Sequence, residues 1–256
     1  MELAFDTNDI EKYHSRSQVA RVLTEKWIHK NMYCPRCGNV HISQFENNRP
    51  VADFHCPNCN SEYELKSKNG QLGHKIADGA YGTMIERINS NNNPDFLFMS
   101  YSDIHYTVSN LILVPKHFFV PEIIEKRKPL SDTARRAGWV GCNILIEKIP
   151  IQGRISIVSN GKIIDAKQVM KKVTASSTLE TKNMESRGWI MDVLNCVNKA
   201  PAPIFSLDDI YAFEPQLQYK YPENHNIRPK IRQQLQLLRD KGFIEFLGRG
   251  NYKKLI

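Results

Sequence analysis

Three charged residues that lie close together in the sequence have the types and spacing of a metal-dependent hydrolytic site. Asp53 ends a short apolar segment, and Glu64 and Lys66 flank Leu65 in the next one. Residues two apart in a strand share a face, so Glu64 and Lys66 would project together while Leu65 packs into the core. A hairpin between the two segments would bring Asp53 beside them, and two carboxylates make a hard oxygen site for Mg²⁺. Such an ion polarises a phosphate and activates a water, while Lys66 would orient or deprotonate that water or neutralise the phosphate.

The same spacing also occurs without catalysis, because Glu and Lys two residues apart are common on the solvated face of a strand. The composition of the chain supports the catalytic interpretation. Its 256 residues include 35 Lys and Arg against 27 Asp and Glu, which gives a formal net charge of +8. This balance favours an anionic partner, with nucleic acid first and a membrane surface second.

Two C-x-x-C motifs separated by 18 residues predict a zinc ribbon. Two cysteines three apart on a tight turn can chelate one tetrahedral ion, and a second such turn completes its shell. Four protein ligands leave no open position, so the ion would be structural rather than catalytic. Free thiols or two redox pairs are the alternative. The proposed ligands are Cys34, Cys37, Cys56 and Cys59, and we expect the remaining Cys142 and Cys196 to be buried thiols.

The segments expected to position these residues alternate between helix and strand. We predict helices over 17–30 and 75–89, strands over 50–54, 62–66, 96–101, 110–114, 144–149 and 154–158, and a turn at 68–70. This order predicts an α/β (α+β) domain around a mixed sheet, over residues 1–180 with the ribbon at 34–59. The polar segment 171–182 is rich in Ser and Thr, and we expect it to be a linker that leaves the placement of a second domain, 183–256, open.

The second domain has the pattern of a winged helix. Helices are predicted over 187–199, after a cap at Ser206, and over 228–241, followed by strands over 243–246 and 252–255. From Arg228 onward there are eight basic residues against two acidic ones, which suits binding to phosphates. A winged helix that contacts protein is the alternative. The side chains expected to face DNA are Arg232, Gln233, Gln236 and Arg239 on the last helix and Arg249 in the turn of the wing.

One further segment combines two arginines with a tryptophan between glycines. Arg135 and Arg136 have the chemistry to hold phosphate, and the indole of Trp139 can stack on a base or contact a methyl group. A loop whose tryptophan fills the core is the alternative.

Longer stretches of the chain resemble the DpnI family of methyl-directed type II restriction endonucleases. They include YCPRCGN, FENNRPVADF, YELKSK, DGAYGTM, TARRAGWVGCNI, SRGW, KIRQQLQLLRDK and GRGNYKK, and they span essentially the whole length. The resemblance implies a PD-(D/E)xK nuclease domain with a zinc ribbon, a C-terminal winged helix, and cleavage of GATC that carries N6-methyladenine. Asp53, Glu64 and Lys66 match the catalytic positions, with Mg²⁺ as cofactor. Trp139 matches an aromatic residue that faces the methylated adenine.

The resemblance has departures, and other functions compete with it. Ala52 rather than a proline precedes Asp53, and the earlier helices of the second domain differ. A non-cutting reader of methylated DNA would keep the ribbon and the winged helix, and Asp53, Glu64 and Lys66 would be only surface residues. An RNA-binding protein is disfavoured because no single-strand stacking platform is visible.

We expect a monomer in the bacterial cytoplasm that acts on double-stranded DNA methylated at adenine and contacts no membrane. The N-terminal segment has no signal-peptide pattern, and no apolar run reaches roughly 18 residues.

Overall fold

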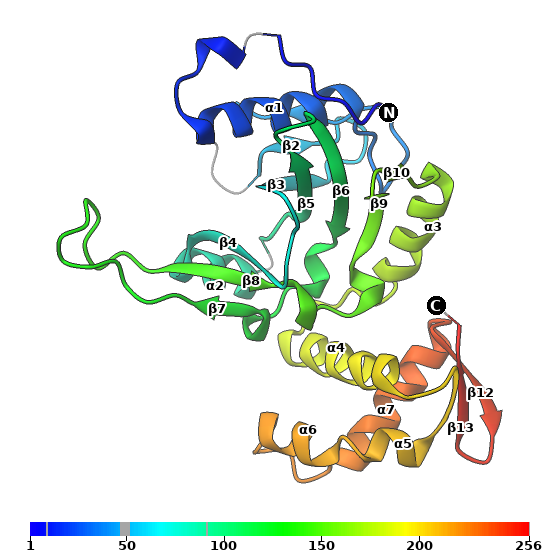
Figure 1. Ribbon diagram of the computed structural model, residues 1–256. Helices are drawn as coiled ribbons and strands as arrows, with labels where there is room; N and C mark the ends of the chain where they lie inside the picture. Colours follow the sequence, from blue (N-terminus) through cyan, green and yellow to red (C-terminus); the bar gives the residue numbers. More distant parts are fainter. Residues whose placement is uncertain (9, 47–51, 91, 256) are drawn as a thin grey trace.

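The computed structural model describes residues 1–8, 10–46, 52–90 and 92–255 (Figure 1). The described residues form a seven-stranded sheet with the strand order β1-β2-β3-β5-β6-β9-β10 and two three-stranded sheets. The elements of the N-terminal part are η1 (Ile10–Lys12), α1 (Arg16–Asn31), β1 (Ser43–Gln44), β2 (Phe54–His55), β3 (Glu62–Asn69), β4 (Lys75–Ala80), α2 (Tyr81–Asn89), β5 (Asp95–Ser102), β6 (Thr107–Val114), η2 (Lys116–Phe118), η3 (Pro121–Ile123), β7 (Ile124–Lys126), β8 (Gly141–Leu145), η4 (Ile146–Lys148), η5 (Ile151–Gly153), β9 (Ile155–Ser159), β10 (Lys162–Ile163) and α3 (Ala166–Ser177).

The central sheet is mixed, because β3 runs parallel to β5 while its other pairs are antiparallel. Strand β5 is buried along almost its whole length, as a strand covered on both faces must be. Its alternate residues enter two different cores. Phe96 and Phe98 join a cluster that continues into the C-terminal helices, and Leu97 and Met99 pack with Trp27 of α1. The predicted α/β architecture around a mixed sheet is therefore confirmed.

The prediction of one helix over 75–89 is wrong for its first half and confirmed for its second. Residues Lys75–Ala80 form strand β4, which pairs with β8, and only Tyr81–Asn89 form helix α2. The helical spacing of the apolar residues there was coincidental, because pairing with a strand more than 60 residues away decided the structure. The register shifts between Asp78 and Ala80, where Gly79 suits the irregular backbone of a β-bulge.

Other boundaries also moved. The expected linker at 171–182 lies largely in helix α3, which buries Val169 and Val173 on one stripe and is capped by the Asp165 side chain. The turn at 68–70 starts late, since Asn69 still belongs to β3, and the strand predicted over 144–149 ends at Leu145. For the strand predicted over 50–54, residues 50 and 51 lie outside the described residues. The described part places Asp53 immediately before β2 rather than at a strand end.

The C-terminal part consists of helices around a small sheet with the strand order β11-β13-β12. Its elements are α4 (Met184–Lys199), β11 (Ile204–Ser206), α5 (Leu207–Tyr211), α6 (Glu214–Lys220), α7 (Ile227–Asp240), β12 (Ile244–Gly248) and β13 (Asn251–Lys254). Ser206 and Asp209 cap α5 reciprocally. The short helix α6 makes four helices where three were expected, while the hairpin β12–β13 forms the wing. Among the described residues, no helix combines the length and apolar character needed to span a membrane.

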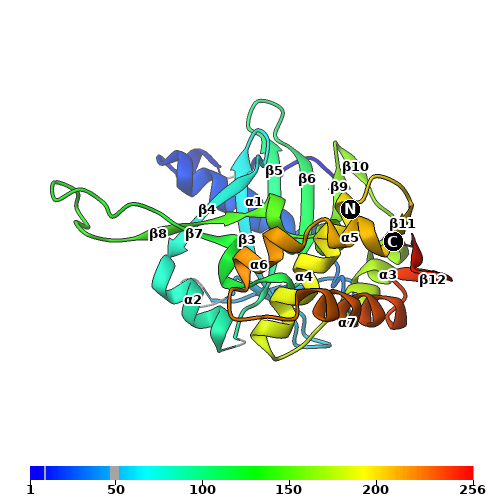
Figure 2. The ribbon, with the colours of Figure 1, turned by 90° about the horizontal axis from the view of Figure 1, so that it is seen from below.

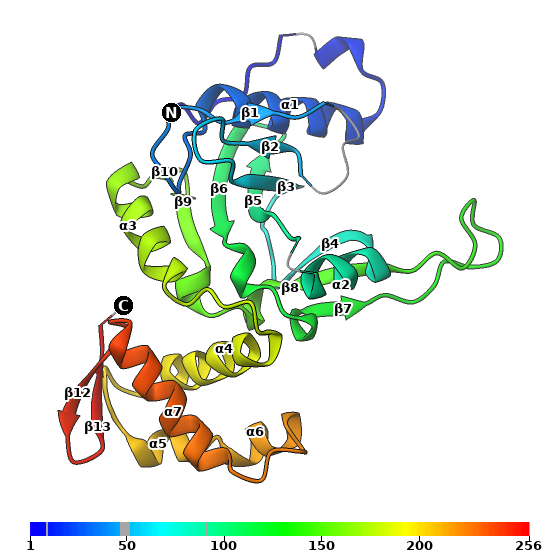
Figure 3. The same ribbon diagram turned by 180° about the vertical axis from the view of Figure 1, so that it is seen from behind.

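Helix α4 packs the C-terminal part of the chain against the N-terminal part (Figure 3). The buried Arg187 donates to the carbonyl oxygens of Phe119 and Thr181, at 3.2 and 2.9 Å. Gln152 and Asn198 exchange two hydrogen bonds of 2.9 Å across the junction. Because these polar contacts surround a continuous apolar core, the structure gives the two parts one defined arrangement.

Candidate active site and DNA-binding surfaces

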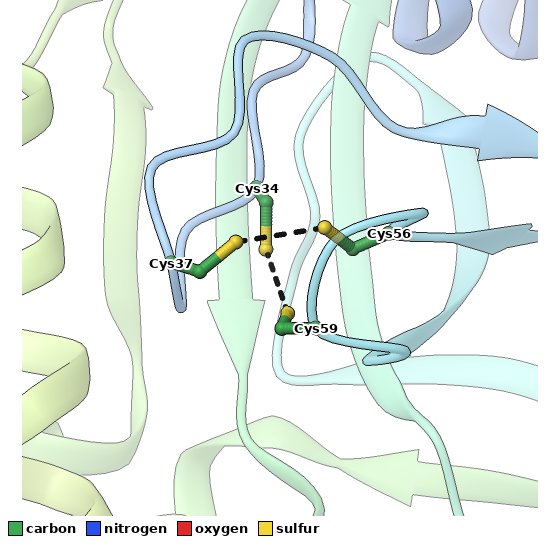
Figure 4. A group of neighbouring side chains, drawn as sticks. All are labelled: Cys34, Cys37, Cys56 and Cys59. Carbon is green, nitrogen blue, oxygen red and sulfur yellow. Dashed lines mark hydrogen bonds between the residues drawn. The ribbon is translucent and has the colours of Figure 1, made fainter.

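The four cysteines of the two C-x-x-C motifs converge on one point (Figure 4). Their sulfur atoms all lie within 4.8 Å of one another, and the described residues contain no other such group of Cys, His, Asp or Glu. The Sγ atoms of Cys34 and Cys59 are 3.6 Å apart, and those of Cys37 and Cys56 are 3.5 Å apart. A tetrahedral zinc shell with bonds of about 2.3 Å has sulfur atoms roughly 3.8 Å apart. Both the donor chemistry and the spacing therefore fit zinc.

The two cysteine turns share one backbone geometry. The N–H of Gly38 donates to Cys34 O and that of Asn60 donates to Cys56 O, each at 2.9 Å. Gly38 and Asn60 both have positive φ angles, 78° and 57°, which glycine and asparagine tolerate best. Each turn directs its two sulfur atoms toward the site. The local sequence of each C-x-x-C motif is therefore enough to orient two of the four ligands.

The second cysteine turn is also the tip of the hairpin that carries the catalytic candidates. Strands β2 and β3 are antiparallel and flank Cys56–Cys59. The Asp53 N–H donates to Tyr63 O at 2.9 Å, and the Leu65 N–H donates to Asp53 Oδ2 at 2.7 Å. The hairpin thus places Asp53 against the segment Glu64–Lys66. Burial raises the pKa of the Asp53 carboxyl, the Leu65 N–H opposes this, and the nearby Glu64 charge adds to the rise.

Glu64 and Lys66 form part of a chain of charged groups with limited exposure to solvent. Lys66 Nζ lies 2.6 Å from Glu64 Oε1 and also pairs with Asp78 Oδ1, and Arg87 Nη2 lies 2.6 Å from Glu64 Oε2. The Asp78 side chain is only 4% exposed. Burial alone would lower the pKa of Lys66, but the carboxylates of Glu64 and Asp78 outweigh it, so the net pKa is raised. The ammonium form of Lys66 is therefore the stable one here.

Asp78 and Arg87 are residues that the sequence analysis missed. Asp78 reaches Lys66 from β4 beside the bulge, and Arg87 reaches Glu64 from α2. Both lie in the stretch 75–89, which was predicted to be one helix; its first half is strand β4, so the prediction misplaced Asp78. The available signal was the stretch DGAYGTM, which contributed to the family resemblance and contains Asp78.

The candidate residues fit a hard divalent cation. Asp53 and Glu64 supply carboxylate oxygens, the ligand type that Mg²⁺ prefers, and the Asp53 carboxylate accepts the N–H of Leu65, the residue that follows Glu64. The cations Lys66 and Arg87 hold Glu64 from two sides. We take Asp53, Glu64 and Lys66 as a proposed catalytic group that acts with Mg²⁺.

A long arm joins β7 to β8 and projects from the body (Figures 1 and 2). Arg135 and Arg136 are exposed on it, and the Arg136 guanidinium lies 4.6 Å from the Trp139 ring centroid. Trp139 belongs to neither core cluster, so it does not fill the core. Its ring lies close to Gly141, where an added Cβ would come within 2.8 Å of it. The arm therefore presents an aromatic side chain and two cations away from the core.

Helix α7 presents a polar face opposite its apolar stripe. Ile231, Leu235 and Leu238 are fully buried. The four side chains of this helix that were predicted to face DNA, Arg232, Gln233, Gln236 and Arg239, are all exposed, and Arg239 pairs with the neighbouring Asp240. Arg249 is exposed at the tip of the wing, at a positive φ of 49° between two glycines. The arm and the wing lie at opposite ends of the molecule, so they would contact separate parts of a ligand (Figure 2).

Two family-wide sequence patterns match the chain. The pattern of the DpnI proteins, described as the Dam-replacing family, matches residues 1–182. The pattern of the Dam-replacing HTH domain, DpnI_C, matches residues 185–254. The first match covers most of the 256 residues, and it includes the cysteine site, the charged chain and the arm. The chain therefore belongs to the DpnI, or Dam-replacing, family, which is the family that its sequence resembles.

Proposed function

We propose that this protein is a Mg²⁺-dependent type II endonuclease that cleaves double-stranded DNA at GATC sites carrying N6-methyladenine. The observation that carries the proposal is the position of Asp53, Glu64 and Lys66 on one hairpin, in a chain of the DpnI family with a helix-turn-helix domain. The basic net charge of +8 suits a polyanionic substrate.

In the proposed mechanism, Asp53 and Glu64 would hold the Mg²⁺ ion. The chemistry that a bound Mg²⁺ ion would supply there is polarisation of the scissile phosphate and activation of a water. Lys66 stands between two carboxylates, Glu64 and Asp78, that favour its protonated form. As a positive group beside the proposed metal ligands, it would orient the attacking water and neutralise the phosphate. Arg87 holds Glu64 in place from the other side.

Recognition of the methyl group is proposed to involve both domains. A methyl group on adenine N6 adds apolar surface in the major groove, and burying one such carbon contributes on the order of 1 kcal/mol. Trp139 on the arm offers an aromatic surface for it, and the exposed face of α7 offers side chains that hydrogen-bond base edges. Two methyl groups per palindromic site, read by two surfaces, would multiply the discrimination.

The four cysteines are proposed to hold a structural zinc ion. A four-thiolate site suits a reducing compartment, which supports the bacterial cytoplasm as the place of action. We propose that the protein acts as a monomer, and sedimentation of the purified protein tests this.

The decisive experiment compares two matched plasmids in the presence of Mg²⁺, one methylated at adenine in GATC and one unmethylated. We expect cleavage of the methylated plasmid alone, and none when Ca²⁺ replaces Mg²⁺. Equal cleavage of both plasmids would contradict the proposed specificity for methylated DNA. Binding of the methylated plasmid without cleavage would indicate a non-cutting reader instead.

Replacing Arg232 with alanine is expected to weaken binding to the methylated site. Arg232 is exposed on α7, and losing a side chain that contacts a base edge costs about 1–3 kcal/mol of binding free energy. Fluorescence anisotropy on methylated and scrambled duplexes, in Ca²⁺, measures the effect, which should fall mainly on the methylated duplex. Arg16→Ala, which replaces another exposed arginine outside the winged helix, is the control. Equal weakening on both duplexes would assign Arg232 to phosphate rather than base contact.

A further inference from the structure

Tyr63 contacts the cysteine site and the catalytic hairpin at the same time. Its ring is fully buried on β3, and its hydroxyl oxygen lies 3.1 Å from the sulfur of the equally buried Cys34. Its carbonyl oxygen accepts the N–H of Asp53, and the next residue is Glu64. A single residue thus adjoins a proposed zinc ligand and both proposed Mg²⁺ ligands.

The hydroxyl of Tyr63 has a chemical purpose at this position. Burying a hydroxyl without a partner costs about 1–3 kcal/mol, and the contact with Cys34 Sγ spares the Tyr63 hydroxyl this cost. A zinc-bound thiolate has no proton to give, and the phenol O–H therefore donates to Cys34 Sγ. Such outer partners fix the orientation of metal ligands and tune the affinity of the site.

A second contact anchors the same cysteine turn to the neighbouring strand. Arg36 lies between Cys34 and Cys37, and its Nε and Nη2 donate to the two carboxylate oxygens of Asp95 at 2.8 and 3.1 Å. Asp95 is the register partner of Tyr63 on β5. The first cysteine turn is therefore attached to two adjacent strands at one level, while the second is the tip of the hairpin. An ion that joins the two turns also fixes the hairpin against the sheet.

We propose that Tyr63 is a positioning residue that couples the zinc site to the Asp53–Glu64 pair. Zinc occupancy, transmitted through the Tyr63 hydroxyl and the hairpin, sets the geometry in which the two carboxylates bind a divalent ion. Loss of the hydroxyl then weakens both metal sites, although it touches neither the divalent ion nor the DNA. The inference rests on the proposed function for the identity of the two metals.

The test uses Tyr63→Phe in the full-length protein, which keeps the ring and removes only the hydroxyl. Tyr33→Phe is the matched control, because the Tyr33 hydroxyl is also buried, adjoins Cys34 in sequence, and has no hydrogen-bond partner among the described residues. Zinc release is followed without DNA, by transfer to an excess of a chromogenic chelator. We expect release about 10–100-fold faster from Tyr63→Phe than from the unchanged protein, with Tyr33→Phe unaffected.

The second readout is Ca²⁺ binding to the zinc-loaded protein, measured by calorimetry, with Asp53→Asn as the reference for loss of the site. Tyr63→Phe is expected to bind Ca²⁺ severalfold more weakly, and Tyr33→Phe is expected to match the unchanged protein. Faster zinc release with unchanged Ca²⁺ affinity would overturn the coupling, as would zinc release at the same rate from both variants.

The zinc and Ca²⁺ measurements test the coupling independently of the DNA cleavage assay that tests the proposed function. A purified protein that contains zinc but leaves methylated DNA intact would overturn the proposed cleavage, while zinc release and Ca²⁺ binding would still decide the coupling. A purified protein that binds no zinc would overturn the coupling directly.

Discussion

Replacing Lys66 with methionine is expected to slow Mg²⁺-dependent cleavage of methylated DNA by on the order of 100- to 1,000-fold, the usual cost of removing one preorganised charge from a reacting centre. Methionine retains an unbranched apolar stem but lacks the ammonium group that lies 2.6 Å from Glu64. Single-turnover cleavage at saturating enzyme measures the chemical step. DNA affinity, measured by anisotropy in Ca²⁺, should change far less than the cleavage rate.

The loss of the ammonium also has a structural cost that the experiment must separate from catalysis. Glu64 and Asp78, 12% and 4% exposed, would be left as like charges without their shared cation. Thermal unfolding of the variant, and assay well below its midpoint, removes this contribution. Lys68→Met is the matched control, because Lys68 lies on the same face of β3 but is exposed to solvent. Unchanged cleavage by Lys66→Met would refute the proposed catalytic role.

The parts of the structure that the sequence predicted well are those that local patterns determine. The apolar stripe of α7, with Ile231, Leu235 and Leu238, needs only the helical period to be recognised. The cysteine turns need only their spacing and the residue that follows each, Gly38 or Asn60. In each of these cases the deciding interactions lie within a few residues, so a single sequence contains them.

Long-range pairing explains what the sequence did not reveal. Strand β4 forms because it pairs with β8, and no local pattern around Ile76 indicates that its partner is Ile144. The positions of Asp78 and Arg87 follow from this ladder and from the helix after it, so the charged chain around Lys66 could be predicted only in part. Helix α3 was mistaken for a linker because only a narrow apolar stripe, including Val169, is buried in an otherwise polar segment.

Replacing Cys34 with alanine is expected to have the largest effect on stability. The apparent binding free energy of structural zinc is about 10–16 kcal/mol in small domains, which is comparable to the whole stability of a protein. Here the ribbon is attached to a larger core, so only part of that energy depends on the ion, and we expect the free energy of unfolding to fall by about 5 kcal/mol. Urea unfolding of the zinc-loaded protein measures the change.

Cys142→Ala separates the effect of the metal from that of a buried thiol. Both cysteines are fully buried, but Cys142 lies outside the four-cysteine cluster. Its replacement removes one buried sulfur and is expected to cost only about 1 kcal/mol, typical of a point substitution. A strong chelator should destabilise the unchanged protein and Cys142→Ala to a similar extent, yet leave Cys34→Ala unaffected, because the last has no ion to lose. Equal unfolding free energies for the two alanine variants would show that Cys34 binds no stabilising ion, and the coupling through Tyr63 would fail with it.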